Sequence, residues 1–419
     1  MKVEGSLPES TTVAVIGGGP AGATVATLLA RAGHQVTLFE RETFPRFRIG
    51  ESLMTETYWT FEKLGMLERL RKSTCPVKAS VQFISETGKA SRPFYFFERN
   101  DHASSYTWQV ERAWFDQAML ENAEEKGADV RFGVGVREVL FDDEHKAIGL
   151  RVEATDGTIS EIQTSVVIDA SGQSNLIARR LGLQKKDSCL SKAAIFTHYE
   201  NGQRDPGIDE GATLIIQTAG NRGWFWYIPL SDNRVSVGVV SSPEDLFGGD
   251  RSVEEELDYQ IEQCAAVRSR LEDARLAAPV RVLRDFSYRS KQVAGDGWVL
   301  VGDAFGFIDP IYSSGVFLAL KSGELAAECI DKALEEGDLS ASRLGTFGSE
   351  LIRGMESIRR LVYAFYTPGF SFSSFIREHP EHRDRVTDIL IGDVFKEGVD
   401  EIFDSLESYC GFAKEDSEV

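Results

Sequence analysis

The feature that most constrains this chain is the glycine-rich turn Gly17-Gly18-Gly19-Pro20-Ala21-Gly22. The short β-branched run from Thr12 to Ile16 precedes it and predicts a buried strand. An alanine- and leucine-rich helix is expected to follow, ending near Arg31. In such a unit Gly17 permits the tight turn, Gly19 lets the backbone approach a pyrophosphate, and Gly22 lets helix and strand pack closely. The turn therefore predicts a dinucleotide at a helix N-terminus.

A second strand is expected from Gln35 to Phe39, and Glu40 follows it. A carboxylate at this place can accept hydrogen bonds from ribose hydroxyls. NAD and FAD share this unit, so other segments have to distinguish them. The predicted cofactor residues of the unit are Gly17, Gly19, Pro20, Ala21, Gly22 and Glu40.

Four downstream segments resemble the aromatic-hydroxylase superfamily of FAD enzymes. They are Phe44 to Ser52, Val110-Glu111-Arg112 with Phe115-Asp116, Val166 to Gly172, and Trp298 to Ala304. Together with the glycine turn they extend the resemblance over about residues 12–330, and they favour FAD over NAD. The further cofactor residues that the resemblance implies are Arg41, Arg48, Gly50, Ser52, Arg112, Asp303, Pro310 and Gly315.

The hexapeptide Trp224-Phe225-Trp226-Tyr227-Ile228-Pro229 matches W-x-W-x-I-P, the signature of the flavin-dependent halogenases, at all four fixed positions. A strand with buried aromatic side chains is the alternative interpretation, because alternating aromatics suit a sheet. The resemblance implies that Trp224 and Trp226 separate the organic substrate from the flavin and so suppress plain hydroxylation.

The segment from Phe307 to Gly315 precedes an apolar helix expected from Val316 to about Leu334. It resembles the halogenase sequence F-x-x-P-x-x-S-x-G, which holds chloride beside the flavin. Successive backbone N–H groups at a helix N-terminus can bind an anion without a cation. The resemblance implies a halide at Ser314 and Gly315 and a catalytic role for Ser313. Hydroxylases of the superfamily share part of this pattern, so it is only moderately specific.

Lys78 lies in Pro76-Val77-Lys78-Ala79-Ser80, which resembles the catalytic-lysine segment of the halogenases. A lone lysine is most often a solvated surface charge, and Lys72 and Lys89 are less well placed competitors. In a desolvated tunnel the pKa of Lys78 would fall, and the amine could act as a nucleophile or an acid.

The resemblance implies a halogenase that uses reduced FAD from a separate flavin reductase, O2, and chloride or bromide. Hypohalous acid would form beside the flavin and move to Lys78, and an electron-rich ring would then take the halogen. Tryptophan halogenases carry a glutamate just before the serine of the chloride segment, and this chain has Tyr312 there. We therefore expect a phenol or pyrrole, attached to an acyl or peptidyl carrier protein, in secondary-metabolite biosynthesis.

The expected fold is α/β, with a Rossmann-type FAD-binding domain, an inserted, mostly antiparallel substrate sheet and a short helical C-terminal region. The FAD-binding domain is expected to be discontinuous, formed by residues 1–75, 105–190 and 280–335. Residues 76–104 and 191–279 are assigned to the substrate domain, and residues 336–419 to the C-terminal region. The aromatic-rich segment 363–372 is either a lid over the substrate or a turn that packs in the core.

Composition narrows the possible partners and location. Lys and Arg total 46 against 66 Asp and Glu, a net charge of −20 that disfavours binding to nucleic acid. The five cysteines and six histidines show no metal-ligand spacing, so no metal site is predicted. Scattered cysteines, a polar N-terminal segment and no long apolar run predict a cytoplasmic protein without a membrane span.

Two other functions stay open from the sequence. The first is an FAD-dependent aromatic monooxygenase, or an isoprenoid-type reductase, on the same scaffold. The second is a non-catalytic flavoprotein.

Overall fold

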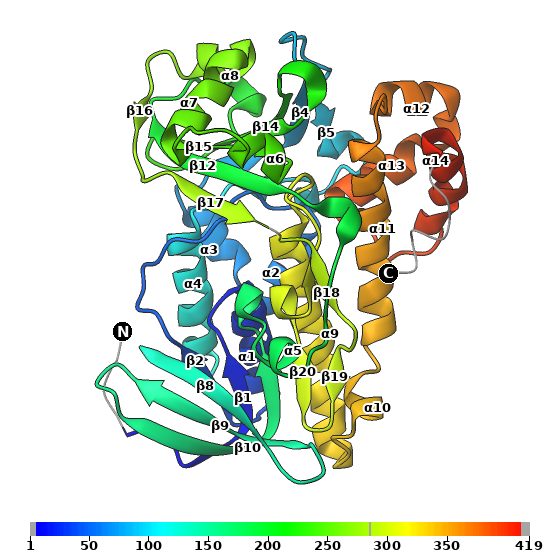
Figure 1. Ribbon diagram of the computed structural model, residues 1–419. Helices are drawn as coiled ribbons and strands as arrows, with labels where there is room; N and C mark the ends of the chain where they lie inside the picture. The colour runs from blue at the N-terminus through cyan, green and yellow to red at the C-terminus, as the bar shows by residue number, and fades with distance from the viewer. Residues whose placement is uncertain (1–5, 285, 412–419) are drawn as a thin grey trace.

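The computed structural model describes residues 6–284 and 286–411, and it places two large sheets at opposite ends of the molecule (Figure 1). The first sheet has the order β19-β20-β10-β1-β2-β7. Strand β9 also pairs antiparallel with β10, and β8 pairs antiparallel with β9. Its strands are β1 (Ser10–Ile16), β2 (Val36–Glu40), β7 (Asp129–Phe132), β8 (Val134–Phe141), β9 (Ala147–Ala154), β10 (Ile159–Asp169), β19 (Ala294–Gly295) and β20 (Trp298–Leu300).

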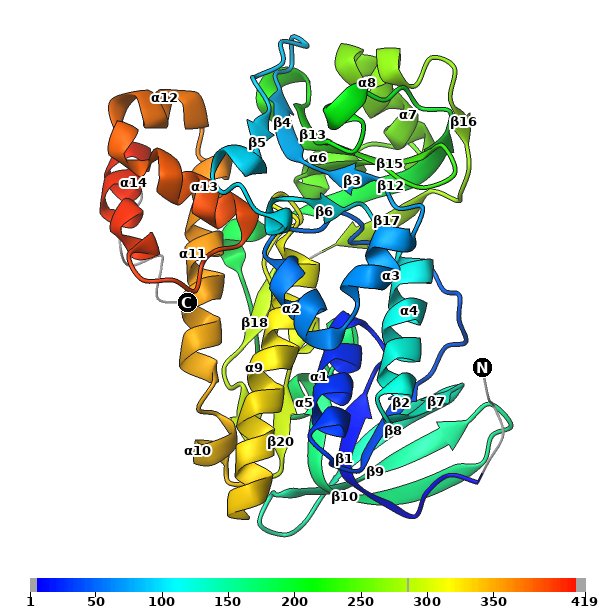
Figure 2. The same cartoon turned by 180° about the vertical axis from the view of Figure 1, so that it is seen from behind.

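The core of the first sheet is parallel, because β1 pairs with both β2 and β10 in parallel register. Helix α1 packs against both α4 and α9, and the three lie side by side in front of this sheet (Figure 2). The helices around this sheet are α1 (Pro20–Arg31), α2 (Thr57–Leu64), α3 (Leu67–Lys72), α4 (Arg112–Glu125), α5 (Leu176–Arg180) and α9 (Ser314–Glu336). Helices on a mostly parallel sheet give the predicted Rossmann-type α/β architecture.

The second sheet has the order β16-β12-β15-β14-β13-β4-β5, and β17 also pairs with β12. It is antiparallel except between β4 and β13, which run parallel. Its strands are β4 (Ser80–Ile84), β5 (Phe94–Tyr95), β12 (Ala193–Glu200), β13 (Thr213–Gln217), β14 (Trp224–Pro229), β15 (Arg234–Ser241), β16 (Arg275–Leu276) and β17 (Arg281–Arg284). Strand β17 extends the sheet beyond residue 279, where the expected substrate domain ends.

Strand β14 is buried along its whole length because both faces of the second sheet are covered. Phe225 and Tyr227 point into a separate apolar cluster that includes residues of α7, whereas Trp224 and Trp226 point toward the main core. This alternation follows from the two-residue period of a strand. The helices over the Phe225 face are α6 (Pro243–Phe247), α7 (Val253–Gln263) and α8 (Ala265–Arg270).

The C-terminal region is helical, as predicted, and it lies along one side of the molecule (Figure 1). Its helices are α10 (Ala341–Leu344), α11 (Gly348–Tyr366), α12 (Phe372–Glu378), α13 (Arg383–Ile391) and α14 (Phe403–Cys410). Short strands complete the fold: β3 (Val77–Lys78) pairs with β6 (Thr107–Trp108), and β18 (Tyr288–Ser290) pairs with β11 (Gln184–Lys186) and β21 (Gly306–Phe307). None of the helices within the described ranges is long and apolar enough to cross a membrane.

Candidate active site

The glycine turn lies between β1 and α1 as the sequence predicts, and its three fingerprint glycines are needed for different reasons. A Cβ on Gly17 would lie 2.5 Å from the carbonyl oxygen of Ala170, and one on Gly22 would lie 2.0 Å from the carbonyl oxygen of Gly17. A Cβ on Gly19 would meet no protein atom within 4 Å. Protein packing therefore explains Gly17 and Gly22, whereas Gly19 borders open space at the start of α1, which fits a bound pyrophosphate.

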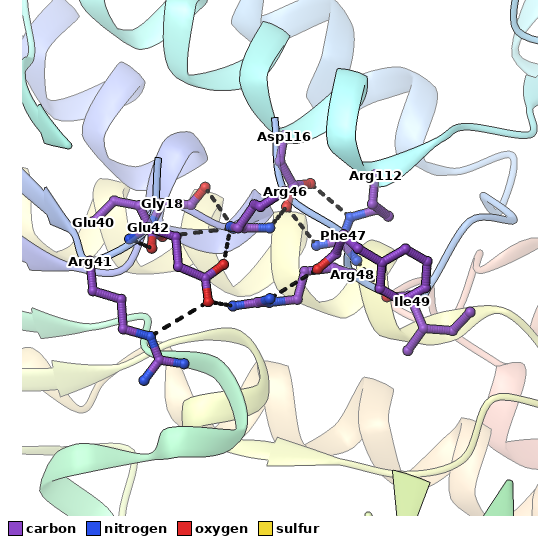
Figure 3. Close-up of polar contacts among 10 residues, drawn as sticks. All are labelled: Gly18, Glu40, Arg41, Glu42, Arg46, Phe47, Arg48, Ile49, Arg112 and Asp116. Carbon is purple, nitrogen blue, oxygen red and sulfur yellow. Dashed lines mark hydrogen bonds and ion pairs between the residues drawn. The ribbon is translucent and has the colours of Figure 1, made fainter. Parts of the chain in front are cut away.

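Glu40 ends β2 and turns its carboxylate toward the glycine turn (Figure 3). Its Oε2 accepts a hydrogen bond of 2.8 Å from Gly18 N, and its Oε1 accepts one of 2.9 Å from Glu42 N. These bonds hold the buried carboxylate at the place predicted for ribose recognition. Each carboxylate oxygen keeps a second lone pair for a ribose hydroxyl.

Three arginines pair with Glu40 or Glu42, and the most deeply buried of them, Arg46, was not predicted. Arg46 lies 2.8 Å from Asp116 Oδ2 and 3.7 Å from Glu40 Oε2 (Figure 3). The two predicted arginines lie farther out, where Arg48 pairs with Glu42 at 2.8 Å and the exposed Arg41 lies 3.9 Å from Glu42. Arg46 stands in the same segment as Arg48, and the sequence carries no signal for which of the two faces the turn.

Arg112 ties α4 to the loop that precedes Ser52. Its Nε and Nη2 donate to the two carboxylate oxygens of Asp116 at 2.7 and 2.9 Å, and its Nη1 donates to Ile49 O at 2.8 Å. A Cβ on Gly50 would lie 3.1 Å from Arg112 Nη1, and Gly50 has a φ of +106°. The bidentate ion pair with Asp116 thus orients Arg112, and the bond from Arg112 to Ile49 O holds the loop beside the cavity described next.

A cavity of about 110 Å³ opens between this loop, the second sheet and the start of α9. It brings together eight of the predicted site residues, which are Gly50, Ser52, Trp224, Trp226, Asp303, Pro310, Ser313 and Gly315. Burial raises the pKa of Asp303 to about 6 despite the opposing charge of Arg112. Most of the lining is apolar, and a few polar side chains from several elements reach it, as expected for a cofactor and substrate site.

The start of α9 supplies backbone donors to this region. The helix begins at Ser314, two residues before the predicted start, so Ser314 and Gly315 lie in its first turn. The first N–H groups of a helix have no intrahelical acceptor, and the helix dipole adds positive potential there. Ser313, just before the helix, adopts a left-handed conformation with a φ of +59°. These features fit the predicted halide site.

Lys78 is buried at the end of β3, so its interpretation as a solvated surface charge is wrong. Its Nζ donates to Ser52 Oγ at 2.8 Å and to Leu53 O at 3.0 Å. Burial lowers the pKa of Lys78 to about 7 from its ordinary value of 10.5. Lys78 does not line the cavity itself, but Ser52 does, so the amine lies directly behind the cavity wall.

We expect Lys78→Met to stabilise the protein more at about pH 6 than at about pH 9. Below pH 7 the Lys78 amine of the folded protein is charged, and burying this charge is unfavourable. Above pH 7 the folded protein releases this proton, whereas an unfolded lysine keeps its proton up to about pH 10.5. Stability of the parent protein therefore rises with pH through this window, and the advantage of Met should shrink by about 2–3 kcal/mol. Denaturant unfolding at the two pH values measures this, and an equal effect at both would contradict the lowered pKa.

Both tryptophans of β14 lie on the cavity wall with their N–H groups already bonded. Trp224 Nε1 donates to Tyr366 Oη at 2.9 Å, and Trp226 Nε1 donates to Ser236 Oγ at 3.1 Å. The Tyr366 hydroxyl in turn donates to Asp309 Oδ2 at 3.1 Å. The indole rings are therefore fixed as a wall between the cavity and the C-terminal helices.

The aromatic-rich segment 363–372 packs on this wall. Phe365 meets the rings of both Trp224 and Tyr312, with centroids 6.4 and 6.3 Å away. Phe372 is buried, and its ring lies 6.3 Å from that of Tyr312. These contacts favour core packing for the part of the segment that touches β14, and the Tyr312 hydroxyl donates to Leu361 O at 3.1 Å.

Tyr366→Phe is expected to lower the free energy of unfolding by about 1–3 kcal/mol, because it leaves the Trp224 N–H buried without an acceptor. It also removes the donor to Asp309, whose pKa burial raises to about 7. Tyr409→Phe is the matched control, since the Tyr409 hydroxyl has no hydrogen-bond partner within residues 6–284 and 286–411. Equal midpoints for the two variants in urea unfolding would contradict this role of Tyr366.

Sequence reasoning missed a buried pair that joins the loop to the second sheet. Glu51 Oε1 lies 2.7 Å from His198 Nε2, and both side chains are buried. Glu51 also lines the cavity, where its Oε2 has no partner among the described residues. Glu51 stands in the motif that predicted the loop, but His198 lies far along the chain and no local pattern connects the two.

The described part of the chain contains no group of three or more His, Cys, Asp or Glu side chains that could hold a metal ion.

Comparison with known proteins identifies the family. The family model described as tryptophan halogenase matches residues 12–100 and 85–369. The chain is 31% identical to a 1H-pyrrole-2-carbonyl peptidyl-carrier-protein chlorinase of Pseudomonas fluorescens, over 97% of this chain and 94% of that protein. It is also 31% identical to the corresponding brominase of Pseudoalteromonas luteoviolacea, over 92% of this chain and 93% of that protein.

A solved structure of a flavin-dependent brominase superposes with a TM-score of 0.85 and 29% identity, covering 96% of this chain and 99% of that one. The match extends over both sheets and the C-terminal helices, and it confirms the predicted fold class. The chain belongs to the tryptophan halogenase family, and it is a flavin-dependent halogenase that uses FAD, O2 and halide.

Proposed function

We propose that this enzyme halogenates an electron-rich pyrrole or phenol ring that is attached to a carrier protein. The observation that carries the proposal is the position of Lys78, a buried amine with no carboxylate partner among the described residues, directly behind the wall of the halide cavity. A separate flavin reductase supplies the reduced FAD. When bound, FAD supplies the activation of oxygen that oxidises halide to hypohalous acid.

The residues of the first sheet and its loops hold the cofactor in this proposal. The turn at Gly17, Gly19 and Gly22 receives the pyrophosphate, and Glu40 receives the ribose. Arg112 fixes the loop at Gly50 against the flavin, and Arg46 adds a buried positive charge beside the glycine turn. The other members of the set are Pro20, Ala21, Arg41, Arg48, Ser52, Asp303, Pro310 and Gly315.

The start of α9 holds the halide. The N–H groups of Ser314 and Gly315 donate to it, and the helix dipole adds to the attraction. Ser313 sets the direction of these groups through its left-handed backbone. Hypohalous acid leaves the cavity past Ser52 and reaches Lys78. The neutral amine either hydrogen-bonds the oxidant or takes its halogen, in which case an N–halogen bond replaces the O–halogen bond and the oxygen leaves as water with a proton from the amine. Trp224 and Trp226 keep the organic ring away from the flavin.

Two observations support a pyrrole or phenol as the ring. Tyr312 occupies the place of the glutamate of tryptophan halogenases, and its hydroxyl is bonded to Leu361 O. A pyrrole or phenol is activated by its own heteroatom and needs no carboxylate. Two relatives that match nearly the whole chain are named for pyrrole rings on a peptidyl carrier protein, which supports a tethered substrate here.

The test offers the same ring in free and tethered form. The purified enzyme, FAD, NADH, a flavin reductase and bromide are incubated with pyrrole-2-carboxylate or with pyrrole-2-carboxyl-loaded holo carrier protein. Intact-protein mass spectrometry is expected to show the bromine isotope pair on the carrier-bound ring, and the free acid is expected to stay unmodified. A free acid brominated as fast as the tethered ring, or a hydroxylated product without bromine, would overturn the proposal.

A further inference from the structure

We infer that Ser52 is a positioning residue for the halogen transfer. Its hydroxyl fixes the direction of the Lys78 amine and offers a hydrogen bond to hypohalous acid where the oxidant leaves the cavity. Thr213 and Gln109 in turn fix the orientation of this hydroxyl. The inference rests on the proposed role of Lys78 and deepens it, because it specifies the group between the cavity and the amine.

The first step is the direction of the hydrogen bonds behind Ser52. Gln109 is fully buried, and its Nε2 donates to Gly211 O at 2.9 Å and to Thr213 Oγ1 at 2.8 Å. A carbonyl oxygen can only accept, so the contact with Gly211 fixes which end of the amide is the nitrogen. Thr213 Oγ1 therefore accepts from Gln109, which leaves its hydrogen and one lone pair for the contact of 2.9 Å with Ser52 Oγ. We assign Thr213 as the donor in this contact, because the Ser52 hydrogen can then serve a group in the cavity.

The second step concerns Ser52 itself. In this assignment its Oγ accepts from Thr213 on one side, and it accepts from Lys78 Nζ, at 2.8 Å, on the other. A hydroxyl oxygen has two lone pairs, so these two bonds occupy both of them. The hydroxyl hydrogen of Ser52 is then free to donate to another group. Ser52 and Thr213 both line the cavity, and Ser52 is almost fully buried. The remaining hydrogen is thus directed at a group in the cavity, and the oxygen of hypohalous acid is such an acceptor.

The third step concerns Lys78. Its bond to Leu53 O uses one N–H, and its bond to Ser52 Oγ uses another. A neutral amine then has its lone pair left, and an ammonium has one N–H left. In either state only one direction at Nζ is open. The Phe96 ring, with its centroid 5.7 Å from Nζ, is an apolar neighbour, and no carboxylate in the described ranges forms an ion pair with the amine.

The experiment follows the Lys78 amine by NMR in the FAD-bound enzyme with 13Cε-labelled lysine, and Lys78→Met assigns the resonance. Ser52→Ala removes an acceptor that stabilises the ammonium form, so the pKa of Lys78 is expected to fall by about one unit. Ser52→Thr keeps a hydroxyl and is expected to retain the parent titration. Ser357→Ala is the matched control, because Ser357 is buried on α11 and its hydroxyl donates to Arg353 O, away from Lys78.

Thr213→Val makes an independent test should Ser52→Ala fail to fold or bind FAD. It removes the group that orients the Ser52 hydroxyl, so the Lys78 titration is expected to shift in the same direction by a smaller amount. Thr197→Val is its matched control, since Thr197 is equally buried in the same sheet and donates to Ala278 O.

The second readout is the yield of brominated phenolic probe for each NADH consumed. Ser52→Ala is expected to lower this yield about tenfold, with the bromide KM unchanged and Ser52→Thr restoring most of it. An unchanged Lys78 titration together with an unchanged yield would overturn the positioning role. If the parent enzyme halogenates no probe while Ser52→Ala still shifts the Lys78 titration, the proposed function fails and the hydrogen-bond arrangement stands.

Discussion

Gly19→Ala is expected to leave the fold intact and to weaken FAD binding by at least about 100-fold, or about 3 kcal/mol. Gly19 has a φ of −81° and a ψ of −176°, which any residue can adopt, and a Cβ there would meet no protein atom within 4 Å. The space that this methyl group would enter is the space that the pyrophosphate needs. Titration of the apo-protein with FAD by calorimetry measures the affinity, and differential scanning fluorimetry measures the fold.

Two other glycines provide the controls. Gly249→Ala also adds a Cβ in open space, but on a loop away from the turn, and it is expected to change neither FAD affinity nor stability. Gly22→Ala places a Cβ 2.0 Å from Gly17 O and is expected to destabilise the fold itself. Tight FAD binding by Gly19→Ala would show that the cofactor does not use this turn.

Lys78→Ala is expected to lower halogenation of an aromatic probe by at least about 100-fold, while FAD binding and NADH consumption with the reductase stay near the parent values. Removal of a positioned acid, base or nucleophile typically has an effect of this size. The substitution removes no residue that lines the cavity, because Lys78 lies behind its wall. Liquid chromatography of the probe, with NADH oxidation followed in parallel, separates halogen transfer from flavin turnover.

Exposed lysines serve as matched controls for this loss. Lys72→Ala removes a side chain that is 79% exposed and lies 3.7 Å from Glu68 on the helix surface. Lys89→Ala removes the other lysine that the sequence offered as a candidate. Both variants are expected to halogenate the probe at the parent rate. Halogenation at the parent rate by Lys78→Ala would show that the Lys78 amine takes no part in the reaction.

Local sequence patterns predicted those parts of the site whose structure depends on residues close together in the chain. The Gly17 to Gly22 turn, the strand Trp224 to Pro229 and the start of α9 each depend on neighbours within one element, so spacing and residue type were sufficient. The strand shows this best, since the two-residue period separates Trp224 and Trp226 from Phe225 and Tyr227.

What the sequence could not predict depends on contacts between distant segments. Lys78 is buried because β3 pairs with β6 and the loop at Ser52 covers its amine. Arg46 rather than Arg48 lies at the glycine turn because Arg46 forms an ion pair with Asp116 on α4. The Tyr366 hydroxyl reaches Trp224 from a helix that follows it by more than a hundred residues. No local sequence pattern predicts contacts between such distant segments.

In the proposed mechanism halide is oxidised in the cavity beside the flavin, and the halogen, not oxygen, reaches the organic ring. A single-turnover experiment tests it most directly, with stoichiometric reduced FAD, bromide, O2 and the carrier-bound pyrrole, analysed by mass spectrometry. We predict close to one bromine on the ring for each flavin oxidised by the parent enzyme. A ring that gains oxygen instead of bromine, or flavin oxidised with all of its equivalents released as hydrogen peroxide, would contradict the account.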